Sequence, residues 1–182
     1  KIVTHDGQFH ADEVFACAAL SLLYRNHVKI IRTRDPKIIV TGDVVVDVCG
    51  VYSPQLNRFD HHQVGRAGTR PNGIHYSSFG LVWLNHGYEM LASFCHQERS
   101  TAFIEQLSQA VDIALVQPID AVDNGQHLFD KAAEKFTGVY PVSVSQIISD
   151  FNKTWDEKGG NDEQFINAVA VASLILTNTI NA

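Results

Sequence analysis

Short apolar runs alternate with stretches of helical periodicity over the first half of the chain. This pattern predicts four strands, at residues 1–5, 28–34, 43–48 and 57–61. Residues 12–25 carry apolar side chains at helical spacing, and Asp12 and Glu13 suit the first turn of a helix, where the helix dipole favours anions. Residues 43–48 are apolar almost throughout, which is typical of a parallel strand buried on both faces.

The second half of the chain is helical in its pattern. Helices are predicted from Ser77 onward and within residues 97–117, 141–155 and 163–182, with breaks at 63–76, 118–125 and 158–162. Because parallel strands need crossover helices, this order predicts an α/β fold: a doubly wound, mostly parallel sheet with helices on both faces. We expect the α/β metal-site domain over residues 1–135. A helical C-terminal extension over 136–182 could be the start of a truncated second domain.

Composition narrows the class of protein. The chain has 182 residues, of which 45% are hydrophobic, as in an ordinary globular domain, and we see no run that could cross a bilayer. Its three widely spaced cysteines do not suggest disulfides or a thiolate zinc site, and they fit an intracellular, reducing compartment. A net charge of −6 argues against non-specific coating of nucleic acid. It is compatible with an enzyme for phosphate esters, because a bound metal ion inverts the local charge.

Imidazole and carboxylate side chains follow the predicted strand ends. These side chains are His5, His10 and Asp12 after the first strand, Asp47 after the third, Asp60, His61 and His62 after the fourth, and Asp120 and Asp123 in a later acid-rich stretch. Taken singly, each has an ordinary explanation as a turn former, a helix cap or a packed histidine. Ligands of open α/β sheets bind at the carboxyl ends of the strands, so the joint pattern favours one shared site.

The residue types indicate a metal site. Imidazoles and carboxylates without thiolates suit Mn²⁺, Mg²⁺, Fe²⁺ or Zn²⁺. Because these candidate ligands are too many for one ion, we predict two divalent ions, with Asp12 or Asp47 as the bridging ligand. The histidines favour Mn²⁺, with Mg²⁺ or Zn²⁺ as alternatives. Two such ions can supply a hydroxide and stabilise the attacking and leaving oxygens of a phosphoryl group.

The triplet Asp60-His61-His62 is the predicted catalytic centre. Neighbouring strand residues face opposite ways, so both imidazoles can serve one site only where the strand ends. We expect His61 to contact metal and His62 to protonate the leaving oxygen. The following loop offers guanidinium groups and a helix N-terminus for a phosphate, with an ordinary surface loop as the alternative. The predicted substrate-binding residues there are Arg66, Arg70, His75 and Ser77.

These motifs resemble those of the DHH phosphoesterase superfamily and, more closely, of its Myg-type branch. The similar stretches are THDGQFHADEVFA, VVDVCGVY, RFDHHQ, TRPNG, YSSFGLVW and IDAVDNG, in the same order over most of residues 3–125. The resemblance implies a doubly wound sheet, a two-metal site usually holding Mn²⁺, and hydrolysis of phosphodiesters or phosphoanhydrides. For the Myg-type branch it also implies 3′–5′ RNA exonuclease activity and, in animals, a mitochondrial or nuclear location.

The resemblance carries over to the residues named above. It places the first motif at His5, His10 and Asp12, the second at Asp47, the third at Asp60, His61 and His62, and the fourth at Asp123, with Asp120 as the near alternative. His10 stands where the superfamily usually has an aspartate, which replaces an anionic ligand by a neutral one.

The leading hypothesis is a metal-dependent phosphodiesterase, a 3′–5′ exonuclease acting on RNA or short oligonucleotides. One alternative is a small-molecule phosphohydrolase of the pyrophosphatase or nucleotide-phosphatase type. Another is a non-catalytic, metal-stabilised binding module. No membrane partner is expected, and the sequence leaves the oligomeric state open.

Overall fold

A five-stranded sheet lies at one end of the computed structural model, which describes residues 1–95, 99–127 and 141–182. The strands are β1 (Ile2–Thr4), β2 (Ile30–Arg32), β3 (Val44–Val46), β4 (Tyr52–Ser53) and β5 (Arg58–Phe59), in the order β2-β1-β3-β5-β4. All neighbours pair in parallel except the edge strand β4, which is antiparallel to β5. The predicted, mostly parallel α/β sheet is therefore confirmed.

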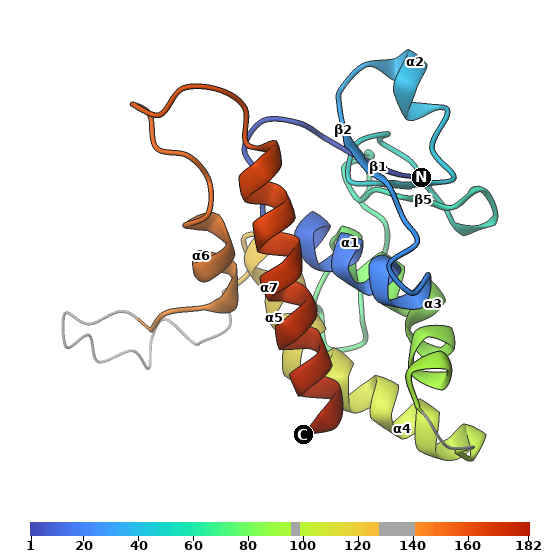
Figure 1. Ribbon diagram of the computed structural model, residues 1–182. Coiled ribbons are helices and arrows are strands. Elements are labelled where there is room, and N and C mark those ends of the chain that lie inside the picture. Colours follow the sequence, from blue (N-terminus) through green and yellow to red (C-terminus); the bar gives the residue numbers. More distant parts are fainter. Residues whose placement is uncertain (96–98, 128–140) are drawn as a thin grey trace.

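The long helices pack on one face of this sheet. Helix α1 (Ala11–Leu23) lies between the sheet, α3 (Ser78–Phe94) and α7 (Asp162–Asn181) (Figure 1). Because α1 has neighbours on several sides, residues 11–21 are all buried, and its sequence is apolar nearly all round. The predicted helical C-terminal segment is thereby present as α7. None of the helices in the described ranges is long and apolar enough to cross a membrane.

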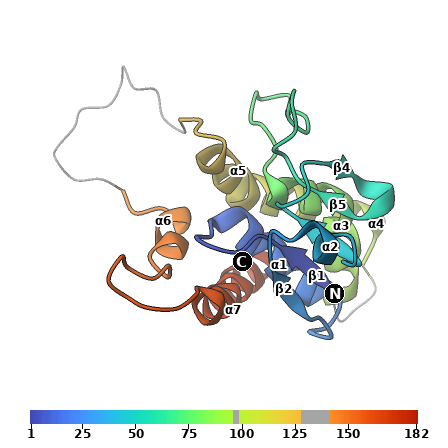
Figure 2. The same ribbon diagram turned by 90° about the horizontal axis from the view of Figure 1, so that it is seen from above.

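The second face of the sheet is covered more thinly. The short helix α2 (Pro36–Ile39) lies on the side of the sheet opposite α1 and α3 (Figures 1 and 2). Val3 and Val45 point to this face, and a Cβ atom added to Gly42, which follows α2, would lie 2.9 Å from a methyl group of each. A residue with a side chain at position 42 could not approach Val3 and Val45 so closely. The chain passes from β1 to β2 and then returns to β3 on the other side of β1, so the sheet is doubly wound.

Three short elements were missed by the sequence analysis. They are α2, β4 and the 3₁₀ turn η1 (Pro54–Leu56), which have four, two and three residues, too few for a periodic pattern to be recognised. Helix α2 nevertheless has ordinary start signals, because the Asp35 side chain accepts a hydrogen bond from the Lys37 amide and Pro36 stands in its first turn.

The helical second half differs from the prediction in its boundaries. Helix α4 (Thr101–Val111) continues through a π-helical turn, Asp112–Val116, into α5 (Gln117–Asp123). The predicted break at 118–125 is therefore wrong, because the helix continues through Pro118, directly after the π-helical turn. Helix α6 (Val144–Ser149) is shorter than predicted. The expected domain boundary at 135/136 and the first residues of the 97–117 helix lie outside the described residues.

Candidate metal centre

The residues that follow three adjacent parallel strands lie together at one edge of the sheet. His5 follows β1, Asp47 follows β3, and the pair Asp60-His61 follows β5. All four side chains are buried. The first turn of α1 adds Asp12 and Glu13, and the last residue of α5 adds Asp123. The convergence predicted from the strand ends is thus present in the structure.

Asp47 is the hub of this cluster. Its two carboxylate oxygens lie 3.4 Å from His5 Nε2, 3.5 Å from His61 Nε2 and 3.2 Å from His62 Nδ1. The Ser78 hydroxyl donates a further hydrogen bond of 2.9 Å to it. Asp47 has a φ of 58°, a left-handed conformation that aspartate tolerates better than most residues. Asp47 therefore lies at the centre of the candidate ligands.

The tautomer of His5 identifies its ligand atom. His5 Nδ1 lies 2.9 Å from the carbonyl oxygen of Asp6, and since that oxygen can only accept, Nδ1 carries the proton. A neutral His5 would therefore point the lone pair of Nε2 at Glu13 Oε1, 2.8 Å away, and at Asp47. Such an arrangement is repulsive unless a cation lies there. In the metal-free protein the cation is a proton: burial lowers the pKa of His5, but the bonds to Asp47 and Glu13 outweigh it and raise the pKa to about 10.

The acidic side chains of the cluster also need a neutralising positive charge. Burial raises the pKa of Asp123 to about 10, with Asp12 as the next contributor, and burial raises the pKa of Glu13 to about 8. Burial acts in the same direction on Asp47, but the three imidazoles hold its pKa well below the ordinary value. Within the described residues, Asp12 Oδ1 and His61 Nε2 are buried without a hydrogen-bond partner. Protonated buried acids and unpartnered ligand atoms both fit divalent cations at this site.

The possible ligands form overlapping groups. Within each group one ligand atom per residue lies within 4.8 Å of the others. The groups are His5, His10 and Glu13; Asp47, His61 and His62; His10, Asp12 and Asp123; and Asp12, Glu13 and Asp47. The imidazole rings of His5 and His10 are 6.3 Å apart, and those of His61 and His62 are 4.2 Å apart. The cluster is therefore large enough to hold more than one ion, and its donor set suits a divalent metal.

His62 and Asp60 form a hydrogen-bonded pair beside Asp47. Asp60 Oδ1 accepts from the His62 amide at 3.0 Å and from His62 Nδ1 at 2.9 Å, while Asp60 Oδ2 accepts from the Gly50 amide. The bonds of Nδ1 to Asp47 and Asp60 raise the pKa of His62 to about 11. Nδ1 of His62 is hydrogen-bonded to these two carboxylates. Since 62% of the side chain is exposed, Nε2 remains available to a ligand. Asp60, predicted as both catalytic residue and ligand, is placed here as the partner of His62.

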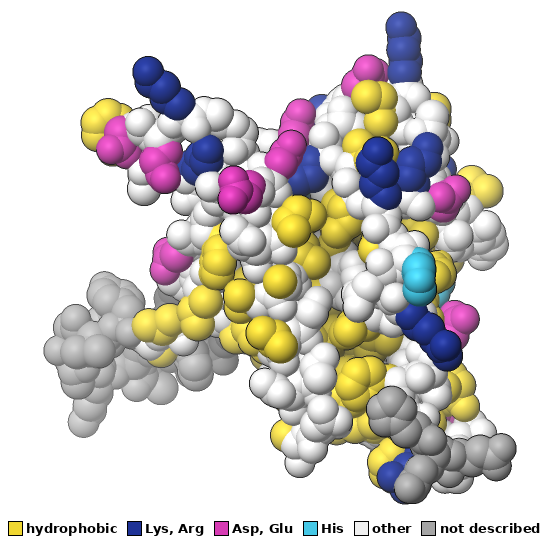
Figure 3. All heavy atoms as spheres, in the orientation of Figure 1, with side chains coloured by type: hydrophobic (Ala, Val, Ile, Leu, Met, Phe, Trp, Pro, Cys, Tyr) yellow, Lys and Arg dark blue, Asp and Glu magenta, His cyan; other side chains and the backbone are white. Residues whose placement is uncertain are grey.

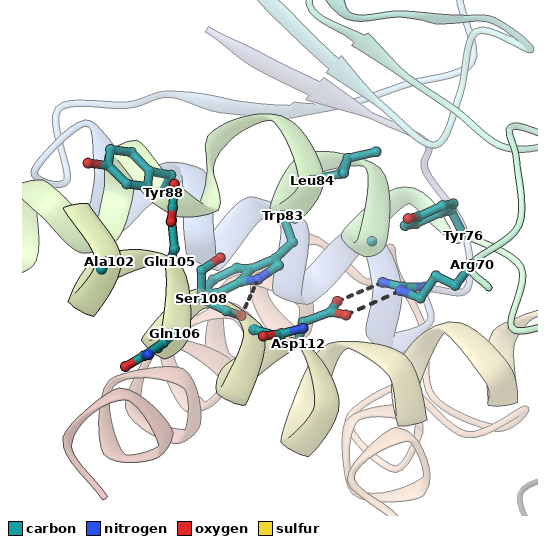
Figure 4. A pocket seen from close by; sticks show the side chains of 12 residues that line it. Arg70, Tyr76, Trp83, Leu84, Tyr88, Ala102, Glu105, Gln106, Ser108 and Asp112 are labelled. Carbon is teal, nitrogen blue, oxygen red and sulfur yellow. Dashed lines mark hydrogen bonds and ion pairs between the residues drawn. The ribbon is translucent and has the colours of Figure 1, made fainter. Parts of the chain in front are cut away.

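Asp120 and Arg70 lie in a separate buried ion pair. Arg70 Nη1 donates to Asp120 Oδ2 at 2.6 Å, and Arg70 also contacts Asp112 of the π-helical turn (Figure 4). Asp120 Oδ1 accepts from the Ser77 hydroxyl and from the Gly80 amide, and a Cβ atom at Gly80 would collide with this carboxylate. These contacts dock α5 onto the start of α3. The geometry therefore favours Asp123, with Oδ2 3.2 Å from His61 Nε2, over Asp120 as a metal ligand.

The other predicted substrate-binding residues lie at the border of the cluster. The exposed Arg66 donates a 2.7 Å hydrogen bond to Asn124, directly after Asp123. His75 pairs with Thr69 of its own loop through Nδ1, and its amide donates to Gln126. Arg66 is thus within reach of the cluster, whereas the interactions of His75 hold its loop to the end of α5.

Two residues of the cluster were missed by the sequence analysis. Glu13 is fully buried, contacts His5 and accepts the His10 amide with both oxygens, in the manner of a capping box. Its spacing of three from His10 could have identified it. Ser78 donates its hydroxyl to Asp47 and its amide to Asp12 Oδ2 at 3.2 Å, which positions two carboxylates at once. No sequence signal separates it from a simple helix start.

Two cavities open beside the cluster. One has a volume of about 360 Å³ and is bounded by α6, and the other has a volume of about 560 Å³ and is bounded by the loops after β1 and β3. His10 and His62 line both. A substrate held at the cluster can therefore extend in two directions past His62.

Comparison with known proteins places the chain in a family. The model of the family MYG1_exonuc, described as "Uncharacterised protein family (UPF0160)", matches residues 1–182. The chain belongs to this family. It is 36% identical over 172 residues to a rat (Rattus norvegicus) protein named MYG1 exonuclease, covering 90% of this chain and 44% of the relative. It is 40% identical over 182 residues to the MYG1 protein of Chlamydia trachomatis, covering 97% of this chain and 53% of the relative.

The chain spans about half the length of the curated relatives it matches. A second relative named MYG1 exonuclease, from human, is 34% identical over 172 residues, covering 90% of this chain and 45% of the relative. No solved structure matches the chain.

The buried Arg70 ion pairs should be essential for stability. Replacing Arg70 by Met leaves Asp120 and Asp112 without their countercharge, and we expect a loss of about 3–5 kcal/mol in the free energy of unfolding. Urea unfolding of the metal-free protein measures it. The control is Arg66→Met, which removes an exposed guanidinium and should change stability by less than about 1 kcal/mol. Equal effects of the two substitutions would contradict the assignment of Arg70 to a structural pair.

Asp123→Asn should have opposite effects with and without metal. Since the folded-state pKa of Asp123 is about 10, the wild-type carboxyl takes up a proton on folding at pH 7, and the free-energy cost grows as pH rises above 3.8. Asparagine needs no proton. We expect the metal-free variant to be more stable at pH 7 by about 1 kcal/mol or more, which is about 2–4 °C in Tm, and the gain to vanish near pH 4.

With Mn²⁺ the order should reverse, because the wild type gains stability from binding and the variant has lost a ligand. Thermal unfolding at several Mn²⁺ concentrations measures both effects. Glu105→Gln, at an exposed position of α4, is the control and should show neither. A wild-type Tm that does not respond to any divalent metal would count against the metal centre.

Proposed function

We propose that this chain carries the catalytic centre of a metal-dependent phosphodiesterase that removes nucleotides from RNA or short oligonucleotides in the 3′–5′ direction. The observation that carries the proposal is the contact of Asp47 with three imidazoles within a cluster of buried acids. The names of the rat and human relatives, MYG1 exonuclease, support the reaction class. The likeness of the motifs to DHH phosphoesterases supports the two-metal form of the site.

Two divalent ions would be held by the residues around Asp47. The ligands would be drawn from His5, His10, Asp12, Glu13, Asp47, His61 and Asp123, with Asp47 central among them. We propose Mn²⁺, because imidazoles and carboxylates are mixed in nearly equal number. When bound, the ions would supply water activation and charge stabilisation for phosphoryl transfer. The chain itself positions these groups through Ser78, which bonds Asp47 and Asp12, and through the Asp6 carbonyl, which orients His5.

His62 would act as the general acid. Asp60 and Asp47 hold its Nδ1–H, keep the ring charged and leave Nε2–H directed toward the substrate side. As the phosphorus–oxygen bond breaks, the leaving oxygen would take the proton from Nε2. Asp60 then serves to fix the tautomer and the orientation of the ring.

Exonuclease and pyrophosphatase activities can be separated directly. With Mn²⁺ present, we expect the chain to release mononucleotides from the 3′ end of a labelled RNA oligonucleotide and to leave pyrophosphate intact. Product analysis by gel electrophoresis, with phosphate release measured in parallel, distinguishes the two. Release of phosphate from pyrophosphate alone would favour the small-molecule phosphohydrolase. An Asp47→Asn variant, which should be inactive on both, excludes a contaminating enzyme.

The general-acid role predicts a selective defect. His62→Gln should lower hydrolysis of oligonucleotides by about 10²–10⁴-fold, because the leaving alkoxide no longer receives a proton. A p-nitrophenyl phosphodiester needs no such proton, so its hydrolysis should fall far less. Steady-state rates on both substrates, with Mn²⁺ affinity from calorimetry, measure the difference. Equal losses on both substrates would show that His62 acts by another route.

A further inference from the structure

The cavity bounded by α6 has two chemically different walls. One wall is the metal centre, with His10, His61, His62 and Asp123. A second wall comes from α6 and its N-cap residue and consists of neutral polar side chains, Ser143, Ser145, Gln146 and Ser149. Val122 and Ala11 add apolar surface between them. At about 360 Å³ the cavity lies in the size range of small-molecule sites and suits a single sugar or nucleoside.

The α6 wall is fixed to the metal centre by direct contacts. The Asn152 side chain, just after α6, donates to the Phe9 carbonyl at 2.8 Å and accepts from the Phe9 amide at 3.0 Å. Phe9 directly precedes His10, so the two walls are tied across 143 residues of sequence. Helix α6 also packs against α1. The distance between the walls is therefore set by the fold.

Two hydroxyl groups of this wall are available to a ligand. The Ser143 hydroxyl accepts from the Gln146 amide, and the Gln146 side chain donates to Asp150. Ser145 and Ser149 are four residues apart, hence on the same face of α6, and their hydroxyls make no hydrogen bond to any residue that the structure describes. No lysine or arginine is found among the described lining residues. Neutral hydroxyls facing a cation-binding wall suit the neutral part of a phosphodiester, which is its sugar.

We propose that Ser145 and Ser149 bind the hydroxyl next to the leaving oxygen on the sugar of the substrate, which makes the site selective for ribose. The inference rests on the proposed function. In 3′–5′ cleavage, a water oxygen bonds to phosphorus, the bond from phosphorus to O3′ breaks, and O3′ takes the proton of His62. His62 lines both cavities, but the second contains Arg34, whereas the described lining of the one beside α6 has no such cation. The inference therefore places the sugar carrying O3′ between His62 and the two serines. Its 2′-hydroxyl is then the group that the serines meet.

The test uses two oligonucleotides that differ only in the 2′-hydroxyl of the sugar carrying the leaving oxygen. With Mn²⁺, the wild-type chain should cleave the ribose form about 10- to 100-fold faster than the deoxyribose form, as judged by kcat/KM. In the double variant Ser145→Ala with Ser149→Ala, this preference should fall to about threefold or less. Cleavage of the deoxyribose form should stay within about twofold of wild type. Ser173→Ala, where the hydroxyl bonds only a carbonyl of its own helix, is the matched control.

A binding measurement separates this inference from the proposed function. Phosphorothioate forms of the same two oligonucleotides, titrated by fluorescence anisotropy, report the ribose preference without turnover. Serine-dependent preference in binding without any cleavage would overturn the proposed function and support the ribose site. Cleavage with an unchanged preference in the double variant, or an equal loss on both substrates, would overturn the ribose site. Unchanged Mn²⁺ affinity of the double variant confirms that the metal centre is intact.

Discussion

The structure depends on the electrostatic cost of burying several carboxyl groups at one sheet edge. Ligand atoms of Asp12, Glu13 and Asp47 all lie within 4.8 Å of one another, and each of the three side chains is buried. Like charges at this distance and depth repel strongly, so protons, imidazolium groups or metal ions must be present. The three histidines around Asp47 offset part of this repulsion, while burial, with further contributions from the neighbouring acids, raises the pKa values of Glu13 and Asp123.

The helices around the sheet provide the packing that stabilises its short strands. The strands have two or three residues each, so the sheet relies on packing against α1, which is itself enclosed by α3 and α7. The start of α3 is fixed by the buried Arg70–Asp120 pair, and the same turn holds Ser78 against Asp47 and Asp12. A structural ion pair and the candidate metal centre thus share one helix terminus. These contacts explain why the polar side chains of Arg70, Ser77 and Ser78 are buried.

Sequence reasoning could find the strand ends but not the directions of the side chains beyond them. His5, Asp47 and His61 were identifiable because each follows a strand, and parallel neighbours end at the same edge. Asp120 and Asp123 are three residues apart in the same helix, and only the way α5 packs decides that Asp120 meets Arg70 while Asp123 meets His61. Glu13 was assigned to the helix dipole alone, because its contact with His5 depends on how the loop between them folds back. The α6 wall is formed by residues far along the chain, and no local pattern points to it.

The cavity beside α6 has one charged and one neutral wall, and this division suggests how an acidic chain could bind a polyanion. With a net charge of −6, the surface as a whole repels a phosphodiester. If the cluster binds a phosphodiester as proposed, the attraction would be local and would come from cations bound there, which would reverse the sign of the field. Substrate binding would then be coupled to metal loading, whereas selection among substrates would fall to the uncharged hydroxyls of α6. Affinity and specificity would thus arise on two walls of one cavity, and either could change without loss of the other.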